Sequence, residues 1–293
     1  MNKLKLNIIG CGHLGQSLAY LWHHRDCFQI QQVMNSTIDS ATRATKFIGA
    51  GVPLKDLGGM EAADVYLIAT PDNQIINSCE SLADSALLKQ GDVVFHCSGA
   101  LSSDVLGSLR QFGVSVCSVH PVRSFADTIN TVENFEGTYC GVEGDAEALE
   151  KIEPTMRAIG ANLFKVQAEF KTLYHAASVM VCNYLTALIE SGIQTYQKAG
   201  IDRETAIEVM QPMVRGTLNN IFTLGTVNAL TGPIARGDDV VLANQLSALT
   251  DWRPEYAQLY TRLGEVALQL SESKGSASKE SLSRMREILL QQG

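Results

Sequence analysis

The sequence lacks the features that would indicate a metal centre, a disulfide framework or a nucleic-acid surface. Its seven cysteines are scattered, and none forms a C-x-x-C pair, so neither zinc-ligand spacing nor a disulfide pattern is present. We therefore expect no metal, and buried thiols in a reducing cytoplasm. Cations are also scarce: 23 Lys and Arg against 31 Asp and Glu give a net charge of −8, which argues against nucleic acid as a partner.

Signals for export or membrane insertion are equally weak. Residues 1–5 lead directly into an apolar run, without the hydrophobic region of a signal peptide. Residues 173–193 are apolar enough to imitate a membrane span, but they include His175, Asn183 and Glu190. We interpret this stretch as a buried helix of a soluble domain and expect no membrane partner.

The feature that carries most information is a glycine-rich turn near the N-terminus. After the apolar residues 6–9 comes G-x-G-x-x-G, and then an amphipathic helix pattern. In a dinucleotide-binding turn, the first glycine allows a tight turn, the second lets a pyrophosphate approach the backbone, and the third lets the helix pack on the strand. The alternative is a tight turn without a ligand. We expect the cofactor to contact Gly10, Gly12, His13, Leu14 and Gly15.

Up to about residue 167, short apolar runs alternate with helical patterns, as in βαβ units with a parallel sheet. Strands are expected at residues 6–9, 28–34, 65–69, 93–97, 114–119, 138–142 and 162–166. The sequence therefore predicts an α/β fold, with a Rossmann-type doubly wound parallel sheet over residues 1–167. Ligands of such sheets lie beyond the carboxyl ends of the strands, so Asn35, Thr70 and Pro71 are also expected at the cofactor.

From residue 168 to residue 293 the pattern is all-α. A long apolar helix is expected over residues 170–198, and Asp202 can cap a further helix that Pro212 bends or ends. One small domain cannot bury all the apolar surface of these helices, so we expect a homodimer that forms through this domain. Gly and Pro indicate loops at residues 213–220 and 230–238. In the second, Arg236 could bind an anionic substrate, or it is structural and Asp238 caps the next helix.

The end of the second strand indicates which nicotinamide cofactor is used. NAD-specific sites place Asp or Glu there to bind the ribose hydroxyls, whereas this chain has Asn35-Ser36-Thr37 and no carboxylate before Asp39. Ser36, Thr37 and Arg43 could bind the 2′-phosphate of NADP, which we favour over NAD. Ser36 and Thr37 could also cap the next helix.

Two groups of residues are candidates for the chemistry. Ser98 and His120 follow neighbouring strands, where a hydroxyl and an imidazole could bind and protonate a substrate oxygen. The alternatives are a turn cap for Ser98 and a structural rim histidine for His120, while His96 is expected in the core. Arg123 could bind a substrate carboxylate or form a surface ion pair.

The second group is Lys171, His175 and Asn183 at the domain junction. Lys171 and His175 are four residues apart and share a helix face. Facing the cleft, the lysine could act as an acid or electrostatic clamp and Asn183 as an orienting group. Solvated or packed side chains are the alternative.

These motifs together resemble a known group of proteins. G-C-G-H-L-G, C-S-G-A-L-S-S-D, H-P-V-R-S-F, K-x-x-Y-H-A-A-S and L-T-G-P-I-A-R-G-D look like the proteins that join a Rossmann-like domain to a DUF2520 domain. The resemblance implies an NADP-binding oxidoreductase-like protein, related to 6-phosphogluconate dehydrogenase-like enzymes. It places the DUF2520-like part in the helical domain.

Two catalytic patterns of those wider relatives fit this chain only in part. The resemblance to prephenate dehydrogenases implies roles for Ser98 and His120. The lysine of their G-S-x-K pattern is missing here, because Leu101 stands near its place. Hydroxyacid dehydrogenases imply a role for Lys171, but the expected asparagine four residues later is His175. The main hypothesis is an NADP(H)-dependent oxidoreductase of a small anionic keto acid, hydroxy acid or imine. The alternatives are a regulatory or scaffold protein that binds NADP without hydride transfer, and a reductase that uses deazaflavin.

Overall fold

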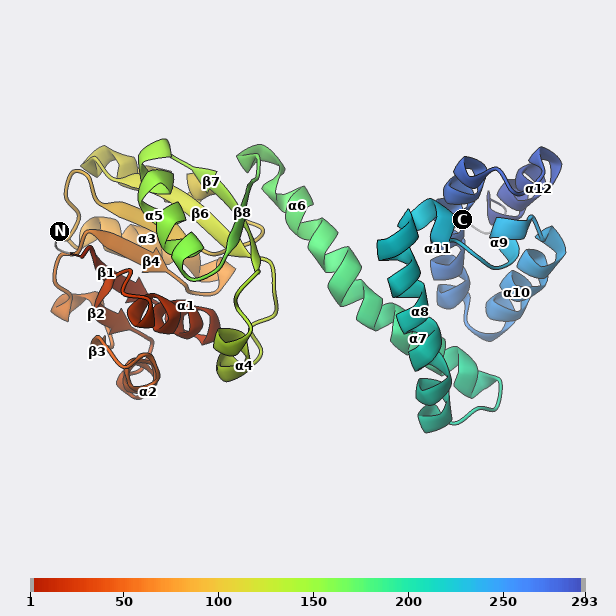
Figure 1. Cartoon of the computed structure of the whole chain (residues 1–293), viewed down its shortest axis with the longest axis horizontal. Helices are drawn as coiled ribbons and strands as arrows, with labels where there is room; N and C mark the ends of the chain where they lie inside the picture. Colours follow the sequence, from red (N-terminus) through yellow and green to blue (C-terminus); the bar gives the residue numbers. More distant parts are fainter. Residues whose placement is uncertain (1–2, 291–293) are drawn as a thin grey trace. The chain divides into compact units, whose positions relative to one another are not determined.

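The computed structural model describes residues 3–290 and divides into two compact units, Met1–Asn183 and Tyr184–Gly293. The first is built on an eight-stranded sheet with the order β3-β2-β1-β4-β5-β6-β7-β8 (Figure 1). All neighbours are parallel except β6 and β7. The strands are β1 (Lys5–Ile9), β2 (Gln29–Met34), β3 (Val52–Leu54), β4 (Val65–Ile68), β5 (Val93–His96), β6 (Ser115–Pro121), β7 (Tyr139–Gly144) and β8 (Asn162–Lys165). This confirms the predicted doubly wound sheet, whose first six strands have the Rossmann order.

Helices cover both faces of the sheet and bury a core on each. On one face Trp22 and Ile152 pack with Phe95, and on the other Ile75 and Leu106 pack with Val94. The helices are α1 (His13–His24), α2 (Ile38–Ile48), α3 (Asp72–Asp84), α4 (Thr128–Glu133) and α5 (Ala146–Ala158), with the 3₁₀ segments η1 (Leu57–Gly59), η2 (Ser103–Phe112) and η3 (Ala168–Phe170). Most cysteines are buried thiols, as predicted: Cys11, Cys79, Cys97, Cys117 and Cys140.

The second unit is helical, as predicted, with two small cores around Leu268 and Met210. Two expectations within it are wrong. The helix that was expected to bend or end at Pro212 runs from Arg203 to Ala229, and its only non-helical residue is Gly225 (φ 77°). Residues 213–220, which were expected to form a loop, therefore lie within this helix. The helices are α7 (Tyr184–Lys198), α8 (Arg203–Ala229), α9 (Pro233–Arg236), α10 (Asp239–Trp252), α11 (Pro254–Lys274) and α12 (Lys279–Leu290).

The long apolar helix is present but is not buried within the chain. It comprises α6 (Lys171–Ser178), the π-helical turn η4 (Val179–Asn183) and α7. Within residues 3–290 it is the one helix long and apolar enough to cross a membrane, and 6% of its most apolar window is buried. At its start, Lys171 and Thr172 bond to residues of the sheet unit, and the two compact units divide between Asn183 and Tyr184.

Candidate functional site: a nucleotide cavity beside a histidine cluster

The glycine turn has the geometry that its sequence predicts. Gly10 has a φ of +79°, and a Cβ there would lie 2.5 Å from Thr70 Cγ2. A Cβ added at Gly12 would have no heavy atom within 4 Å, so the backbone there is open to approach. At Gly15 a Cβ would touch Gly10 O at 3.3 Å and Ala69 at 3.4 Å, so this residue sets the close packing of α1 on the sheet. The chain thus presents the first amides of α1 without a side-chain cap.

Asn35 fixes this turn against the end of β2. Its Oδ1 accepts a hydrogen bond from Cys11 N, and its Nδ2 donates to Cys11 O at 3.4 Å. A carboxylate could accept the first bond but could not donate the second. The amide at this position therefore makes two hydrogen bonds that a carboxylate could not both make, and it also adds no negative charge.

A cavity of about 500 Å³ lies along these strand ends. This is within the usual size range of cofactor sites, roughly 300–1,000 Å³. Thr70 Oγ1 is buried there without a hydrogen-bond partner, which leaves a polar group for a ligand. The lining includes the predicted residues Gly10, Gly12, His13, Leu14, Asn35, Ser36, Thr70 and Pro71. The open backbone at Gly12 and the unpaired Thr70 hydroxyl fit a dinucleotide.

Two predicted phosphate ligands lie elsewhere. Arg43 is exposed on α2 and is not among the lining residues. Thr37 caps α2 by accepting a hydrogen bond from Ser40 N at 3.2 Å, which is the capping alternative. Lys55, which follows β3, does line the cavity. Sequence reasoning missed it because β3 has only three residues and contains Pro53.

Ser98 is a turn-forming residue whose hydroxyl makes three hydrogen bonds within the protein. Its Oγ donates to Asp72 Oδ2 at 2.8 Å and accepts from Ala100 N and Leu101 N at 3.2 and 3.0 Å. A hydroxyl has one proton to donate and two lone pairs, so none is left for a substrate. The geometry therefore supports the turn-cap alternative and not an acid role.

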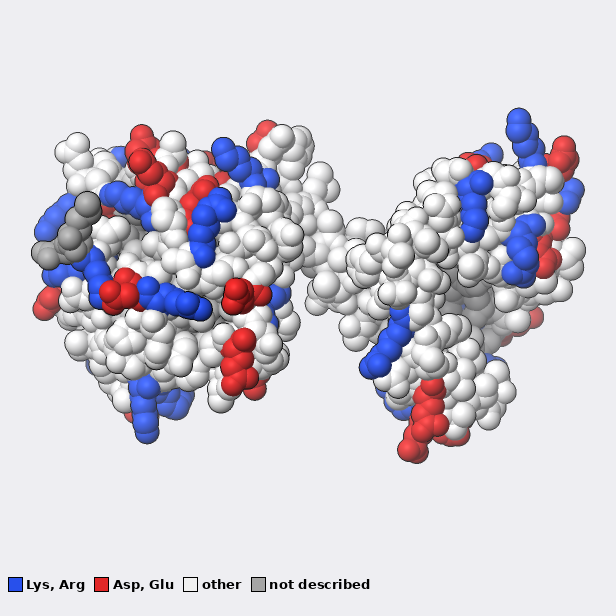
Figure 2. All heavy atoms as spheres, in the orientation of Figure 1, with Lys and Arg blue, Asp and Glu red and all other residues white. Residues whose placement is uncertain are grey.

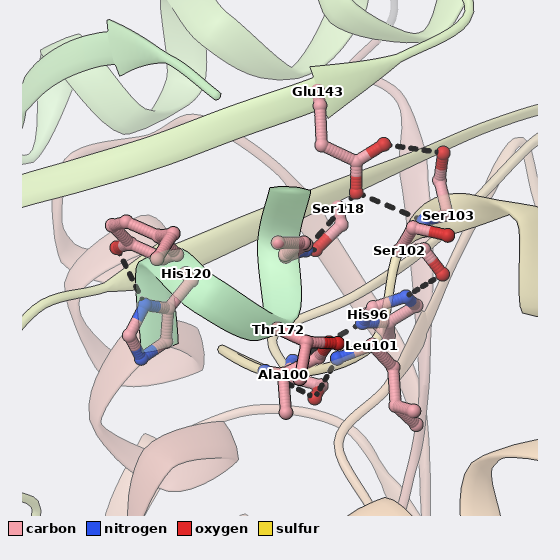
Figure 3. Close-up of polar contacts among 12 residues, drawn as sticks. His96, Ala100, Leu101, Ser102, Ser103, Ser118, His120, Glu143 and Thr172 are labelled. Atoms are coloured by element: carbon pink, nitrogen blue, oxygen red, sulfur yellow. Dashed lines mark hydrogen bonds and ion pairs between the residues drawn. The ribbon is translucent and has the colours of Figure 1, made fainter. Parts of the chain in front are cut away.

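His96 is a satisfied core residue, as predicted. Its Nδ1 accepts from Ser98 N at 3.1 Å, and its Nε2 donates to Ser102 O at 3.2 Å (Figure 3). Burial, together with the Lys171 charge, lowers its pKa from 6.5 to about 4. The imidazole is therefore neutral in the folded protein at neutral pH.

This shift makes the stability of the protein depend on pH. Between pH 6.5 and about 4 the unfolded chain binds a proton at His96 that the folded chain does not, so stability falls as the pH falls. The full effect is roughly 3 kcal/mol. Urea unfolding at pH 7 and pH 5 measures it, and His96→Gln should have a flatter profile. An equal pH slope in the variant would contradict this assignment.

Three segments converge at a histidine cluster next to Ser98. His120, on β6, has its Nδ1 2.8 Å from the Tyr174 hydroxyl of α6 (Figure 3), and its ring centroid lies 5.6 Å from that of His175. A Cβ on Gly99 would lie 2.3 Å from His175 Nδ1 and 2.8 Å from His120 Nε2, so only glycine fits between these rings. His175 Nδ1 is buried without a partner. The structure thus brings His120 and His175 together, and adds Tyr174 and Gly99, which were not predicted.

The protonation of this cluster follows from its burial. Burial, and then the neighbouring His175 and Lys171, lowers the pKa of His120 to about 4. Burial raises the pKa of Tyr174 to about 12. At neutral pH the pair is therefore a neutral imidazole and a neutral phenol. With the phenol donating to Nδ1, the ring proton is on Nε2.

Lys171 does not face a cleft, contrary to the prediction. It is 1% exposed, and its Nζ donates to Glu143 Oε1 at 3.0 Å and to Ser118 Oγ. Glu143 also accepts from Ser103 N and Ser103 Oγ, at 2.8 and 2.7 Å (Figure 3). The lysine thus joins α6 to the sheet and to the start of η2. Its ammonium is enclosed by protein, so Lys171 has a structural role and does not act as the predicted electrostatic clamp.

The remaining predicted residues have other surroundings, each described within its own unit. Arg123 donates from Nη1 to Asn134 O at 2.6 Å and to Thr138 Oγ1 at 3.2 Å, so it holds its own loop, and within residues 3–290 it forms no ion pair. Asn183 is exposed on the π-helical turn η4, which changes the helix face that its spacing predicted. Arg236, in the helical unit, lies 3.9 Å from Asp238 with its side chain 65% exposed.

Comparison with known proteins assigns both parts of the chain. The Rossmann-like domain model matches residues 1–121, and the model of the Domain of unknown function (DUF2520) matches residues 138–267. The chain joins a Rossmann-like domain to a DUF2520 domain. This confirms the resemblance, although the DUF2520 match begins at β7 in the sheet and not in the helical part. No curated protein matches the sequence.

Several solved structures share the fold across both domains. Protein TM1727 from Thermotoga maritima is 24% identical, with a TM-score of 0.73 over 92% of this chain and 99% of that chain. Protein BF3122 from Bacteroides fragilis is 20% identical, with a TM-score of 0.70 over 92% and 98%. A reductive aminase from Aspergillus terreus, in complex with NADPH and ethyl levulinate, is 16% identical, with a TM-score of 0.60 over 99% and 93%.

Proposed function

We propose that this chain is a cytoplasmic NADP(H)-dependent oxidoreductase that acts on a small anionic metabolite with a C=O or C=N group. The observation that carries the proposal is the position of Ser98 and Gly99. Ser98 lines the nucleotide cavity, and the adjacent Gly99 packs against both imidazoles of the cluster. A cofactor in the cavity would therefore end beside groups that bind and move protons. The structure of a reductive aminase with NADPH on the same fold supports this class of reaction.

The residues of the cluster suit the proton side of such a reaction. The bound nicotinamide supplies the hydride. His120 can give its Nε2 proton to the substrate oxygen while its Nδ1 takes the proton of the Tyr174 hydroxyl, so the imidazole stays neutral throughout. An alkoxide is a stronger base than a phenolate, so the raised pKa of Tyr174, about 12, permits this transfer. The unpaired His175 Nδ1 is available to orient the substrate.

The test measures binding and turnover separately. Quenching or enhancement of nicotinamide fluorescence gives the affinity of the wild-type protein for NADPH. Oxidation of NADPH is then followed with a panel of keto acids and imines, with 4-deuterated cofactor to establish stereospecific transfer. We expect tight binding and substrate-dependent oxidation. Tight binding without turnover would favour a regulatory protein instead, and no binding would reject both functions.

We also infer that two copies associate through their apolar helices. Residues 172–189 contain no Asp, Glu, Lys or Arg, and Figure 2 shows α6 without charged side chains on the face in view. Val181 is 68% exposed on η4 and Phe222 is 86% exposed on α8. Apolar surface on this scale normally marks an interface.

The association can be tested at Phe222. Light scattering during size-exclusion chromatography should give a dimer for the wild-type protein and a monomer for Phe222→Lys, because a buried ammonium without a partner opposes association. The matched control is Ile129→Lys, which adds the same charge at a side chain that is 60% exposed on α4. A monomeric wild type, or one that partitions onto lipid vesicles, would refute the dimer.

A further inference from the structure

We propose that Lys55 binds the 2′-phosphate of NADP(H) and selects it over NAD(H). The inference rests on the proposed function, in which the cavity holds a nicotinamide dinucleotide. It replaces Arg43, which the sequence favoured, with a residue that the sequence did not indicate.

The strand register places Lys55 at the correct end of the sheet. Met34 pairs with Leu54 in parallel β2 and β3, and Asn35 N donates to Leu54 O at 3.1 Å. Lys55 therefore follows β3 at the same level as the residues that follow β2, and it lines the cavity together with Asn35 and Ser36. In dinucleotide-binding domains the end of the second strand is where the adenosine ribose is recognised. The lysine is thus beside the expected position of the 2′ substituent.

The charges around Lys55 leave it available for an anion. Among the described residues of the lining it is the only Lys or Arg, and within residues 3–290 it forms no ion pair. The carboxylate of the adjacent Asp56 accepts a hydrogen bond from Gly58 N at 3.1 Å as the cap of η1. In a chain of net charge −8, a phosphate dianion needs such a local cation. An ammonium supplies three donors and a full charge.

Ser36 completes the site without introducing a competing charge. It follows Asn35 directly and lines the same cavity, so its hydroxyl can donate to a phosphate oxygen. No carboxylate stands in residues 35–38, so nothing there binds the two ribose hydroxyls of NAD in the usual way. The combination of Lys55 and Ser36 therefore favours the phosphorylated cofactor.

Equilibrium binding to the full chain tests the proposal without relying on turnover. Dissociation constants are measured for NADPH and NADH by nicotinamide fluorescence, and for 2′-phospho-ADP-ribose and ADP-ribose by calorimetry. Lys55→Ala should weaken the two 2′-phosphorylated ligands about tenfold to a hundredfold. It should leave NADH and ADP-ribose within about twofold. The salt dependence of NADPH binding should also become shallower, because a screened charge contact is lost.

Two matched variants complete the experiment. Lys46→Ala removes an exposed lysine from α2 and should change none of the four affinities. Arg43→Ala tests the competing residue and should also leave them unchanged. The inference is overturned if Lys55→Ala leaves NADPH affinity intact, if it weakens NADH equally, or if Arg43→Ala has the larger effect. A wild-type protein that binds none of the four ligands would instead reject the proposed function itself.

Discussion

Replacing Lys171 with methionine is expected to lower the free energy of unfolding by about 3–5 kcal/mol. The lysine and glutamate side chains are 2% and 4% exposed, so the variant leaves the Glu143 carboxylate buried without its counter-ion. Methionine keeps an unbranched apolar side chain in the space, which limits the loss of packing. The expected cost therefore comes mainly from the unpaired charge.

Urea unfolding followed by circular dichroism measures the effect. The control is Arg157→Ala, which breaks an ion pair with Glu153 whose arginine side chain is 58% exposed, and which should cost no more than about 1 kcal/mol. The double variant Lys171→Met with Glu143→Gln should recover much of the loss, because no buried charge remains. Equal costs for Lys171→Met and Arg157→Ala would show that the buried pair does not stabilise the fold.

Local sequence patterns predicted the fold and the cofactor turn well because short-range geometry determines them. The roles of Gly10 and Gly15 follow from a turn between a strand and the next helix, and both contacts are present as expected. The seven strands predicted in the first unit are all present, and the central ones, such as β4 and β5, bury an unbroken apolar run. The eighth, β3, has three residues and a proline, as edge strands allow, and its omission concealed Lys55.

The errors concern residues whose partners lie far along the chain. Lys171 was placed on a cleft because its spacing to His175 defines a helix face, but its burial depends on Glu143, on β7. Tyr174 lies between those residues in the sequence and gains a role only because β6 brings His120 to its hydroxyl. A single sequence gives no signal for such pairings between residues that are far apart in the chain.

His120→Ala is expected to lower kcat for NADPH oxidation about 10²- to 10⁴-fold, the usual contribution of a positioned acid or base. The affinity for NADPH should change little, since His120 is not among the residues that line the nucleotide cavity. Steady-state kinetics and fluorescence titration separate the two effects. His24→Ala, which removes an exposed histidine of α1, is the control and should retain full turnover.

The pH profile distinguishes this role from a merely structural one. Because burial lowers the pKa of His120 to about 4, the imidazole of the free protein stays neutral above that value. The His120 contribution to kcat/KM should therefore be constant from pH 5 to pH 8. Tyr174→Phe removes the donor to Nδ1 and should lower kcat while leaving NADPH affinity unchanged. A histidine that relays the proton as proposed must be neutral and must be required for turnover. A loss of kcat/KM centred near pH 6.5 in the wild type would contradict the first condition, and full turnover in both variants would contradict the second. Either result would remove His120 from the reaction.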